Sequence, residues 1–149
     1  MTQRGPGTTA VHGRHGASRG PLAAPIVQAS TFAFGSAAEM RRYLEGDEEL
    51  FLYTRYANPT VRALGEALAA VEGGESALAL ASGMAAMTTA VVSLARAGEE
   101  VLASASLYGG TVRLLTELLP RFGVTSRFLV AGELEGVDRL AGERSRVLI

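Results

Sequence analysis

The chain has 149 residues, of which 48% are hydrophobic, and a formal net charge of −1 at pH 7. This length and composition predict a soluble globular domain with its own core and exclude an intrinsically disordered chain. The near-zero charge, without a basic run longer than a pair of arginines, argues against a nucleic-acid partner. The absence of cysteine excludes disulfides and thiolate metal sites, and the cytoplasm is the default expectation for location.

The N-terminal segment is predicted to be poor in regular structure. Residues 1–20 are rich in glycine and arginine and lack the apolar stretch of a signal peptide, so we expect a flexible arm. His12 and His15 lie in this arm without a carboxylate or thiolate nearby, which argues against a metal site. Pro21–Phe34 contains two prolines and is predicted to be extended.

Two helices are predicted next. Ser36 and Glu39 form the capping-box pattern of a short helix that ends near Gly46, and residues 47–49 predict a solvated acidic turn. Asn58 is a favourable N-cap for a longer helix, and Pro59 suits its first position. Apolar residues recur at helical spacing up to a Gly73-Gly74 end, at Val61, Leu64, Leu68 and Val71.

The rest of the chain alternates between strand-like and helix-like stretches. Strands are predicted at 77–81, 101–105, 126–130 and 146–149, and helices at 84–97, 110–119 and 134–140. This alternation predicts an α/β fold with a mostly parallel sheet and helices on both faces. Ser76–Ala95 is uncharged over 20 residues, but it is rich in alanine and interrupted by Ser82-Gly83, so we expect a buried strand and helix and no membrane span.

Ser82-Gly83-Met84 connects the first predicted strand to its helix. A strand that turns directly into a helix presents free backbone N–H groups and a positive dipole end, and glycine permits close approach of a ligand. Such a turn at the carboxyl end of a parallel strand suits a phosphate. An ordinary turn capped by Ser82 explains the same residues, and the sequence alone favours it. Neither a P-loop nor a G-x-G-x-x-G pattern is present, which argues against nucleotide sites.

Two further segments carry candidate ligand-binding residues. Arg55 can hold phosphate oxygens bidentately, with Tyr53 as a further donor, although an exposed arginine packed against Tyr53 or Tyr56 is the commoner arrangement. Tyr108 follows the second predicted strand, where its ring can stack on a flat heteroaromatic ligand and its hydroxyl can lie near the reacting atoms. A half-buried packing tyrosine is the alternative.

Together these segments resemble the Cys/Met-metabolism (trans-sulfuration) family of pyridoxal 5′-phosphate (PLP) enzymes. The resemblance begins at AVHG (10–13) and PIVQASTF (25–32), and it continues through YTRYANPT (53–60), ASGMAA (81–86) and YGGT (108–111). It implies the type I PLP-dependent transferase fold, similar to aspartate aminotransferase. It also implies cleavage or replacement chemistry on cystathionine, homoserine-ester or methionine-type substrates. The position before Asn58-Pro59 is Ala57, where many members have glycine.

The resemblance also implies roles for individual residues. The backbone N–H groups of Gly83 and Met84, in the turn that begins at Ser82, are expected to hold the cofactor phosphate. Tyr53 and Arg55 are expected to reach that phosphate from the neighbouring subunit of a homodimer, usually paired into a homotetramer. Tyr108 is expected to stack on the pyridine ring and to take part in proton transfer.

The chain contains no lysine, because all fourteen basic residues are arginines. On the resemblance we expect residues 1–58 to be an N-terminal arm and linker, and residues 59–149 to be the first, incomplete part of the PLP-binding large domain. The Schiff-base lysine of the family would then lie beyond Ile149, and this chain alone would be inactive. The first hypothesis is therefore the N-terminal part of a lyase or transferase of sulfur amino-acid metabolism. The alternative is a non-catalytic fragment or split-gene product that acts as an interaction module.

Overall fold

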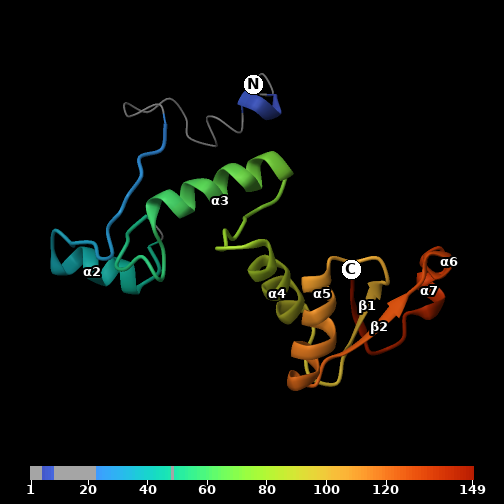
Figure 1. Ribbon diagram of the computed structural model, residues 1–149. Helices are drawn as coiled ribbons and strands as arrows, with labels where there is room; N and C mark the ends of the chain where they lie inside the picture. The colour runs from blue at the N-terminus through green and yellow to red at the C-terminus, as the bar shows by residue number, and fades with distance from the viewer. Residues whose placement is uncertain (1–4, 9–22, 48) are drawn as a thin grey trace. The chain divides into compact units, whose positions relative to one another are not determined.

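The computed structural model describes residues 5–8, 23–47 and 49–149 (Figure 1). Its contacts divide the chain into two compact units, Met1–Ala79 and Leu80–Ile149. Most of the expected N-terminal arm, including His12 and His15, lies outside the described residues. From residue 23 to Phe34 the backbone contains neither a helix nor a strand, in agreement with the predicted extended segment, and Thr31 forms an isolated antiparallel bridge with Tyr53.

The first unit contains the short helix α2 (Ala37–Leu44). The Ser36 hydroxyl accepts a hydrogen bond from the Glu39 N–H at 3.2 Å, as the capping pattern predicts. The Glu39 carboxylate, however, accepts from the Gly35 N–H at 2.6 Å, one residue earlier than in a regular capping box. The helix ends before Gly46, whose φ of +97° lies in the left-handed region that favours glycine.

The longer predicted helix is α3 (Pro59–Glu72), and both of its ends are as expected. Asn58 accepts a hydrogen bond from the Thr60 N–H at 2.9 Å, and Gly73 closes the helix with φ of +71°. The buried face of α3 is not the predicted apolar stripe, since the buried residues of the helix are Gly65 and Ala69. The large residues of the predicted apolar stripe are about half exposed, namely Val61, Leu64, Leu68 and Val71. The backbone of Ala77 lies against this face at Gly65, where a Cβ would be only 2.7 Å from the Ala77 carbonyl oxygen.

The strand predicted at residues 77–81 is wrong. Within the described part of the chain this segment has no ladder partner, and Leu78 is 72% exposed. An apolar run becomes a strand only where a neighbouring strand takes its hydrogen bonds, so the composition of the run alone was misleading.

The second unit is built on a three-stranded parallel sheet. Strand β1 (Glu100–Ser104) lies between β2 (Thr125–Leu129) and β3 (Ser145–Leu148), in the order β2-β1-β3. Val101 pairs with Ser126 on one side and Val147 on the other. The strands predicted at 101–105, 126–130 and 146–149 are therefore confirmed to within one residue, and so is their parallel pairing.

The helices of this unit differ from the prediction in their inner geometry. Helix α4 (Gly83–Leu94) ends three residues early, and the predicted 110–119 helix is α5 (Gly109–Arg113), a π-helical turn η1 (Leu114–Leu118) and a 3₁₀ turn η2 (Leu119–Phe122). Pro120 explains the change, because it lacks an N–H and its ring crowds the preceding turn. The predicted 134–140 helix is two single turns, α6 (Ala131–Leu134) and α7 (Val137–Leu140), with Gly136 between them.

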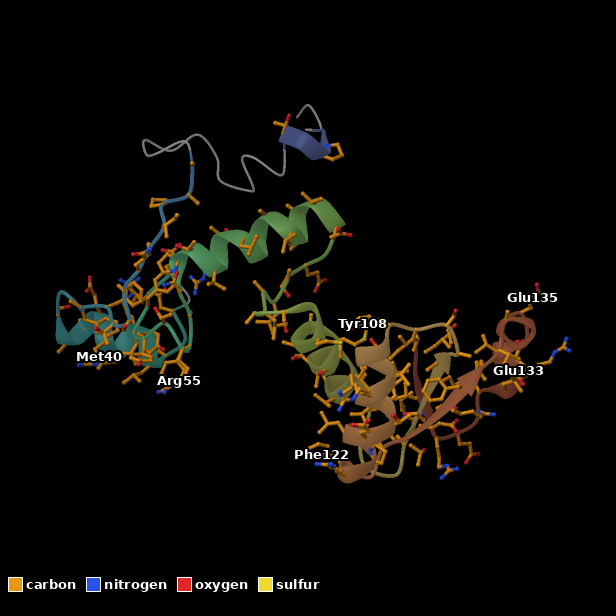
Figure 2. All side chains as sticks on the ribbon, viewed as in Figure 1. Met40, Arg55, Tyr108, Phe122, Glu133 and Glu135 are labelled. Atoms are coloured by element: carbon orange, nitrogen blue, oxygen red, sulfur yellow. The ribbon has the colours of Figure 1, made fainter. Side chains whose placement is uncertain are left out.

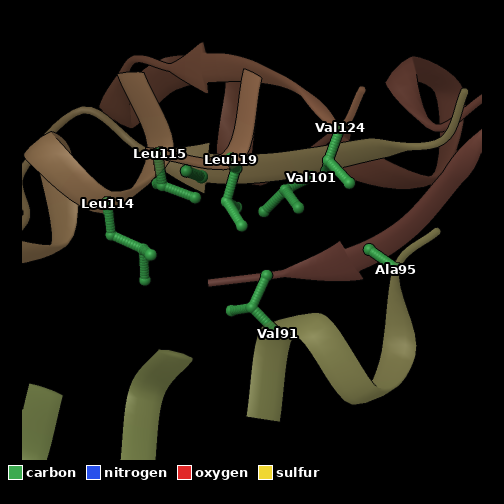
Figure 3. Close-up of a cluster of buried hydrophobic side chains, with 8 residues drawn as sticks. Val91, Ala95, Val101, Leu114, Leu115, Leu119 and Val124 are labelled. Atoms are coloured by element: carbon green, nitrogen blue, oxygen red, sulfur yellow. The ribbon is translucent and has the colours of Figure 1, made fainter. Parts of the chain in front are cut away.

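The core of the second unit lies between β1 and the helices on one face of the sheet (Figure 3). Strand alternation directs Val101 and Ala103 to this face, and the cluster is completed by Val91, Ala95, Leu114, Leu115, Leu119 and Val124. Leu102 is directed to the opposite face, together with Arg127, whose guanidinium donates a hydrogen bond to the Leu140 carbonyl of α7. Helices therefore lie on both faces, as expected. No helix among the described residues has the length and apolar character needed to cross a bilayer.

Candidate functional site

The turn at Ser82 begins helix α4 in the second unit. Ser82 is extended, with φ of −160° and ψ of 159°, and its hydroxyl oxygen accepts a hydrogen bond from the Ala85 N–H at 3.1 Å. Its carbonyl accepts from the Ala86 N–H at 3.0 Å. The predicted cap is therefore present, and the hydroxyl hydrogen of Ser82 is left to donate to another group.

Gly83 and Met84 occupy the first turn of α4, where a backbone N–H has no acceptor four residues earlier in the helix. The space beside Gly83 is open, since a Cβ built there meets no heavy atom within 4 Å. This turn is suitable for an anion, because it presents two N–H groups at the positive end of a twelve-residue helix and is open to an approaching ligand.

Tyr108 lies beside this turn, at the beginning of α5 (Figure 2). A Cβ placed on Gly110 would lie 2.6 Å from Tyr108 Cε1 and 3.1 Å from Met84 Sδ. The tyrosine ring and the Met84 side chain therefore both lie against the Gly110 backbone. Tyr108 remains 73% exposed, so a surface of its ring is available to a ligand. The structure thus brings together the Ser82 turn and Tyr108, which are separate in the sequence.

Two residues of this arrangement were not identified as site residues from the sequence. Gly110 is needed because any side chain there would displace the tyrosine ring. Thr111 is buried, and its hydroxyl lies 4.0 Å from Met84 Sδ, which links the first turns of α4 and α5. The sequence contains one feature that indicates this contact, namely two consecutive glycines directly after Tyr108, beyond the end of a predicted strand.

Tyr53 and Arg55 lie in the first unit, in the loop before α3. The Arg55 guanidinium carbon is 4.9 Å from the Tyr53 ring centroid and 5.4 Å from that of Tyr56. Within this chain the exposed arginine stacks on both tyrosines, which is the commoner arrangement that the sequence left open. Tyr53 and Arg55 also line an open hollow of about 450 Å³, together with Val27–Ser30, Thr54 and Asn58.

Two carboxyl groups with lowered pKa values, Glu99 and Glu100, lie at the start of β1. Hydrogen bonds from the Arg96 N–H and the Arg146 side chain lower the pKa of Glu99. The Ser145 hydroxyl and the Arg127 side chain lower the pKa of Glu100 at the start of β1. Tyr108 follows the other end of that strand. No cluster of three potential metal ligands occurs among the described residues. The groups at this site that can contact a ligand are the backbone N–H groups of the Ser82 turn and the ring of Tyr108.

The sequence matches the Cys/Met metabolism PLP-dependent enzyme family over residues 7–149. The chain belongs to this family. It is 39% identical over 149 residues to an L-methionine gamma-lyase of Fusobacterium nucleatum subsp. nucleatum, covering 99% of this chain and 38% of that protein. It is 35% identical over 145 residues to an O-acetyl-L-homoserine sulfhydrylase of Leptospira meyeri, covering 95% of this chain and 32% of the relative. The chain thus spans about a third of the length of these relatives.

A solved structure of a family enzyme confirms the predicted fold. A Campylobacter jejuni protein described as an O-acetylhomoserine (thiol)-lyase superposes with a TM-score of 0.85 at 30% identity, over 98% of this chain and 36% of that one. That crystal structure carries N′-pyridoxyl-lysine-5′-monophosphate. The fold class is therefore the α/β fold of type I PLP-dependent enzymes, and PLP is the cofactor of the family.

The described residues fit two of the three recognition features of PLP. Its phosphate fits the N–H groups of Gly83 and Met84 beside open space, and its flat ring fits the exposed surface of Tyr108. Its aldehyde requires an amine for covalent attachment, and no lysine occurs among the 149 residues. Groups that suit a phosphate and a flat ring therefore lie together among the described residues, and the 149 residues contain no lysine.

Proposed function

We propose that this chain supplies the phosphate- and ring-binding part of a PLP-dependent enzyme of sulfur amino-acid metabolism, a C–S lyase or a γ-replacement transferase. One observation carries the proposal. The open first turn of α4 and the exposed Tyr108 ring lie together around Gly110, although Met84 and Tyr108 are 24 positions apart in the sequence.

Each residue has a defined task in this proposal. The N–H groups of Gly83 and Met84 bind the phosphate, and Ser82 caps α4 and donates its hydroxyl hydrogen. The Tyr108 ring packs on the pyridine ring and keeps its hydroxyl at the reacting atoms, where it holds or transfers a proton. PLP, when bound, supplies an electron sink for bond cleavage in an amino-acid substrate.

Tyr53 and Arg55 are proposed to act across a subunit boundary. Their phenol and guanidinium groups suit a second set of phosphate contacts. In this arrangement residues 1–58 form an arm and linker that contact the partner, and residues 59–149 are the first part of the large domain. The assembly is then a homodimer, or a homotetramer made of two such dimers.

The substrate is proposed to be a sulfur amino acid or a homoserine ester. Relatives with similar identity are named as a lyase and as a sulfhydrylase, so the choice between methionine, cystathionine and acyl-homoserine needs an assay. The absence of lysine from these 149 residues favours a second candidate, a non-catalytic interaction module. Release of a keto acid from any of these substrates by the chain with PLP would exclude that candidate.

The phosphate-binding proposal is tested by equilibrium dialysis with PLP and with pyridoxal, which lacks the phosphate. Gly83→Ala keeps the backbone N–H but places a methyl group in the open space through which the phosphate would approach. PLP binding is expected to weaken by roughly tenfold, which corresponds to about 1.4 kcal/mol. The added methyl group meets no protein atom, so folding should be unchanged. Gly132→Ala is the matched control, because a Cβ there also meets open space. Equal affinities for PLP and pyridoxal would refute the proposal.

A further inference from the structure

Side chains from the start of α3 form hydrogen bonds to the backbone of Pro25 and Val27. The Val27 N–H donates to Thr60 Oγ1 at 2.8 Å, and the Val27 carbonyl accepts from Asn58 Nδ2 at 3.1 Å. The Thr60 hydroxyl in turn donates to the Pro25 carbonyl at 3.0 Å. Two side chains thus hold an extended segment that has no strand ladder in the described structure.

Asn58 is the centre of this arrangement. It is 6% exposed, and both polar atoms of its side chain have hydrogen-bond partners. Oδ1 accepts from the Thr60 N–H at 2.9 Å and thereby caps α3, while Nδ2 donates to both Val27 O and Thr54 Oγ1 at 3.1 Å. An aspartate at this position would keep the cap and lose both donated hydrogen bonds.

The bond from Asn58 to Thr54 connects this arrangement to the candidate ligand residues. Thr54 lies between Tyr53 and Arg55, and its N–H donates to the Ser30 carbonyl at 2.9 Å. Its hydroxyl donates to the Ala29 carbonyl and accepts from Asn58. The loop that carries the Tyr53 phenol and the Arg55 guanidinium is therefore bound to the Pro25–Ser30 segment through the N–H and the hydroxyl of Thr54.

We infer that Asn58 and Thr60 are positioning residues, which fix the loop 53–55 so that Tyr53 and Arg55 line the hollow formed with Val27–Ser30. The inference deepens the proposed function, in which these two side chains bind the phosphate of the partner's cofactor. Asn58 and Thr60 are assigned a positioning role only. They act through Thr54 and through the segment that forms the other wall of the hollow.

Thr60→Val tests the inference with little change in shape. The valine keeps the backbone N–H that is capped by Asn58 but removes the hydroxyl contacts to Val27 and Pro25. Amide exchange at Val27 and Thr54 should become about fivefold faster, the factor that a net hydrogen bond of about 1 kcal/mol produces. Thr60→Ser should restore slow exchange. Thr116→Val is the control, because the Thr116 hydroxyl donates to the Val112 carbonyl four residues earlier, far in sequence from the 53–55 loop.

Asn58→Asp provides an independent second variant. Helicity by circular dichroism should be retained, because the carboxylate still caps α3, while exchange at Val27 and Thr54 should again accelerate. Unchanged exchange at both amides in folded Thr60→Val and Asn58→Asp proteins would overturn the inference. So would acceleration of the same size in the Thr116→Val control.

Arg55→Ala separates this inference from the proposed function. PLP affinity is measured by equilibrium dialysis for Arg55→Ala, Thr60→Val and Thr60→Ser. Loss of affinity in the first two with recovery in the third supports both claims. If Arg55→Ala leaves affinity unchanged, the phosphate role of Arg55 is wrong, while amide exchange still decides whether the loop is held by Asn58 and Thr60. If Arg55→Ala weakens binding but Thr60→Val does not, despite faster exchange, the positioning inference is wrong.

Discussion

Gly110→Ala should displace the Tyr108 ring while leaving the fold intact. The new Cβ would lie 2.6 Å from Tyr108 Cε1 and 3.1 Å from Met84 Sδ, whereas carbon atoms in contact prefer about 3.5–4.0 Å. The ring must therefore move by roughly 1 Å, and it is free to do so because it is 73% exposed. Alanine also favours the helical backbone by about 0.5–1 kcal/mol relative to glycine, so stability should change by no more than about 1 kcal/mol.

The functional effect of this substitution should be larger than its effect on stability. Loss of an aromatic stacking contact of about 0.5–1.5 kcal/mol predicts PLP binding that is roughly two- to tenfold weaker. Thermal unfolding measures stability, equilibrium dialysis measures affinity, and the nuclear Overhauser effect between the Gly110 Hα and the Tyr108 ring measures the displacement. Gly109→Ala is the adjacent control, since a Cβ there meets open space. Equal PLP affinity in the two variants, with the ring displaced only in Gly110→Ala, would refute the role of Tyr108.

Three further predictions concern stability and association. Leu119→Ala should cost about 2–5 kcal/mol in chemical unfolding, because Leu119 is 0% exposed, whereas Leu118→Ala, at 39% exposure, should cost clearly less. The hydroxyl of Ser145 lowers the pKa of Glu100, so the stability that this carboxylate contributes should be present above its ordinary pKa and lost as pH falls through the lowered pKa. Glu100→Gln should reduce this loss of stability in acid, measured by unfolding at a series of pH values. Leu64, half exposed on α3, should promote association, and Leu64→Glu should lower the average mass in sedimentation equilibrium; an unchanged mass would contradict this.

Local signals in the sequence predicted the elements that depend on a few neighbouring residues. The Asn58 cap, the Gly73 end of α3 and the three strands of the parallel sheet were found because capping chemistry and apolar runs act over short ranges. The strand expected at 77–81 failed because pairing requires a distant partner. The π-helical turn before Pro120 could have been suspected from the proline, but its exact form depends on how Leu114–Leu119 pack in the core.

The candidate site was predicted in part. Motifs identified the Ser82 turn and Tyr108, and the structure adds Gly110 and Thr111 as the residues that join them. No periodicity reveals such contacts, because they depend on the space between two helix ends. Likewise, the sequence identified Asn58 only as a helix cap. Its hydrogen bonds to Val27 and Thr54 became evident from three-dimensional proximity.

The most direct measurement is a crystal structure of the chain grown with PLP. It should place the cofactor phosphate within hydrogen-bonding distance, about 2.7–3.2 Å, of the backbone nitrogens of Gly83 and Met84, with the pyridine ring against Tyr108. A phosphate bound elsewhere, or a Ser82 turn without the cofactor at saturating PLP, would contradict the account.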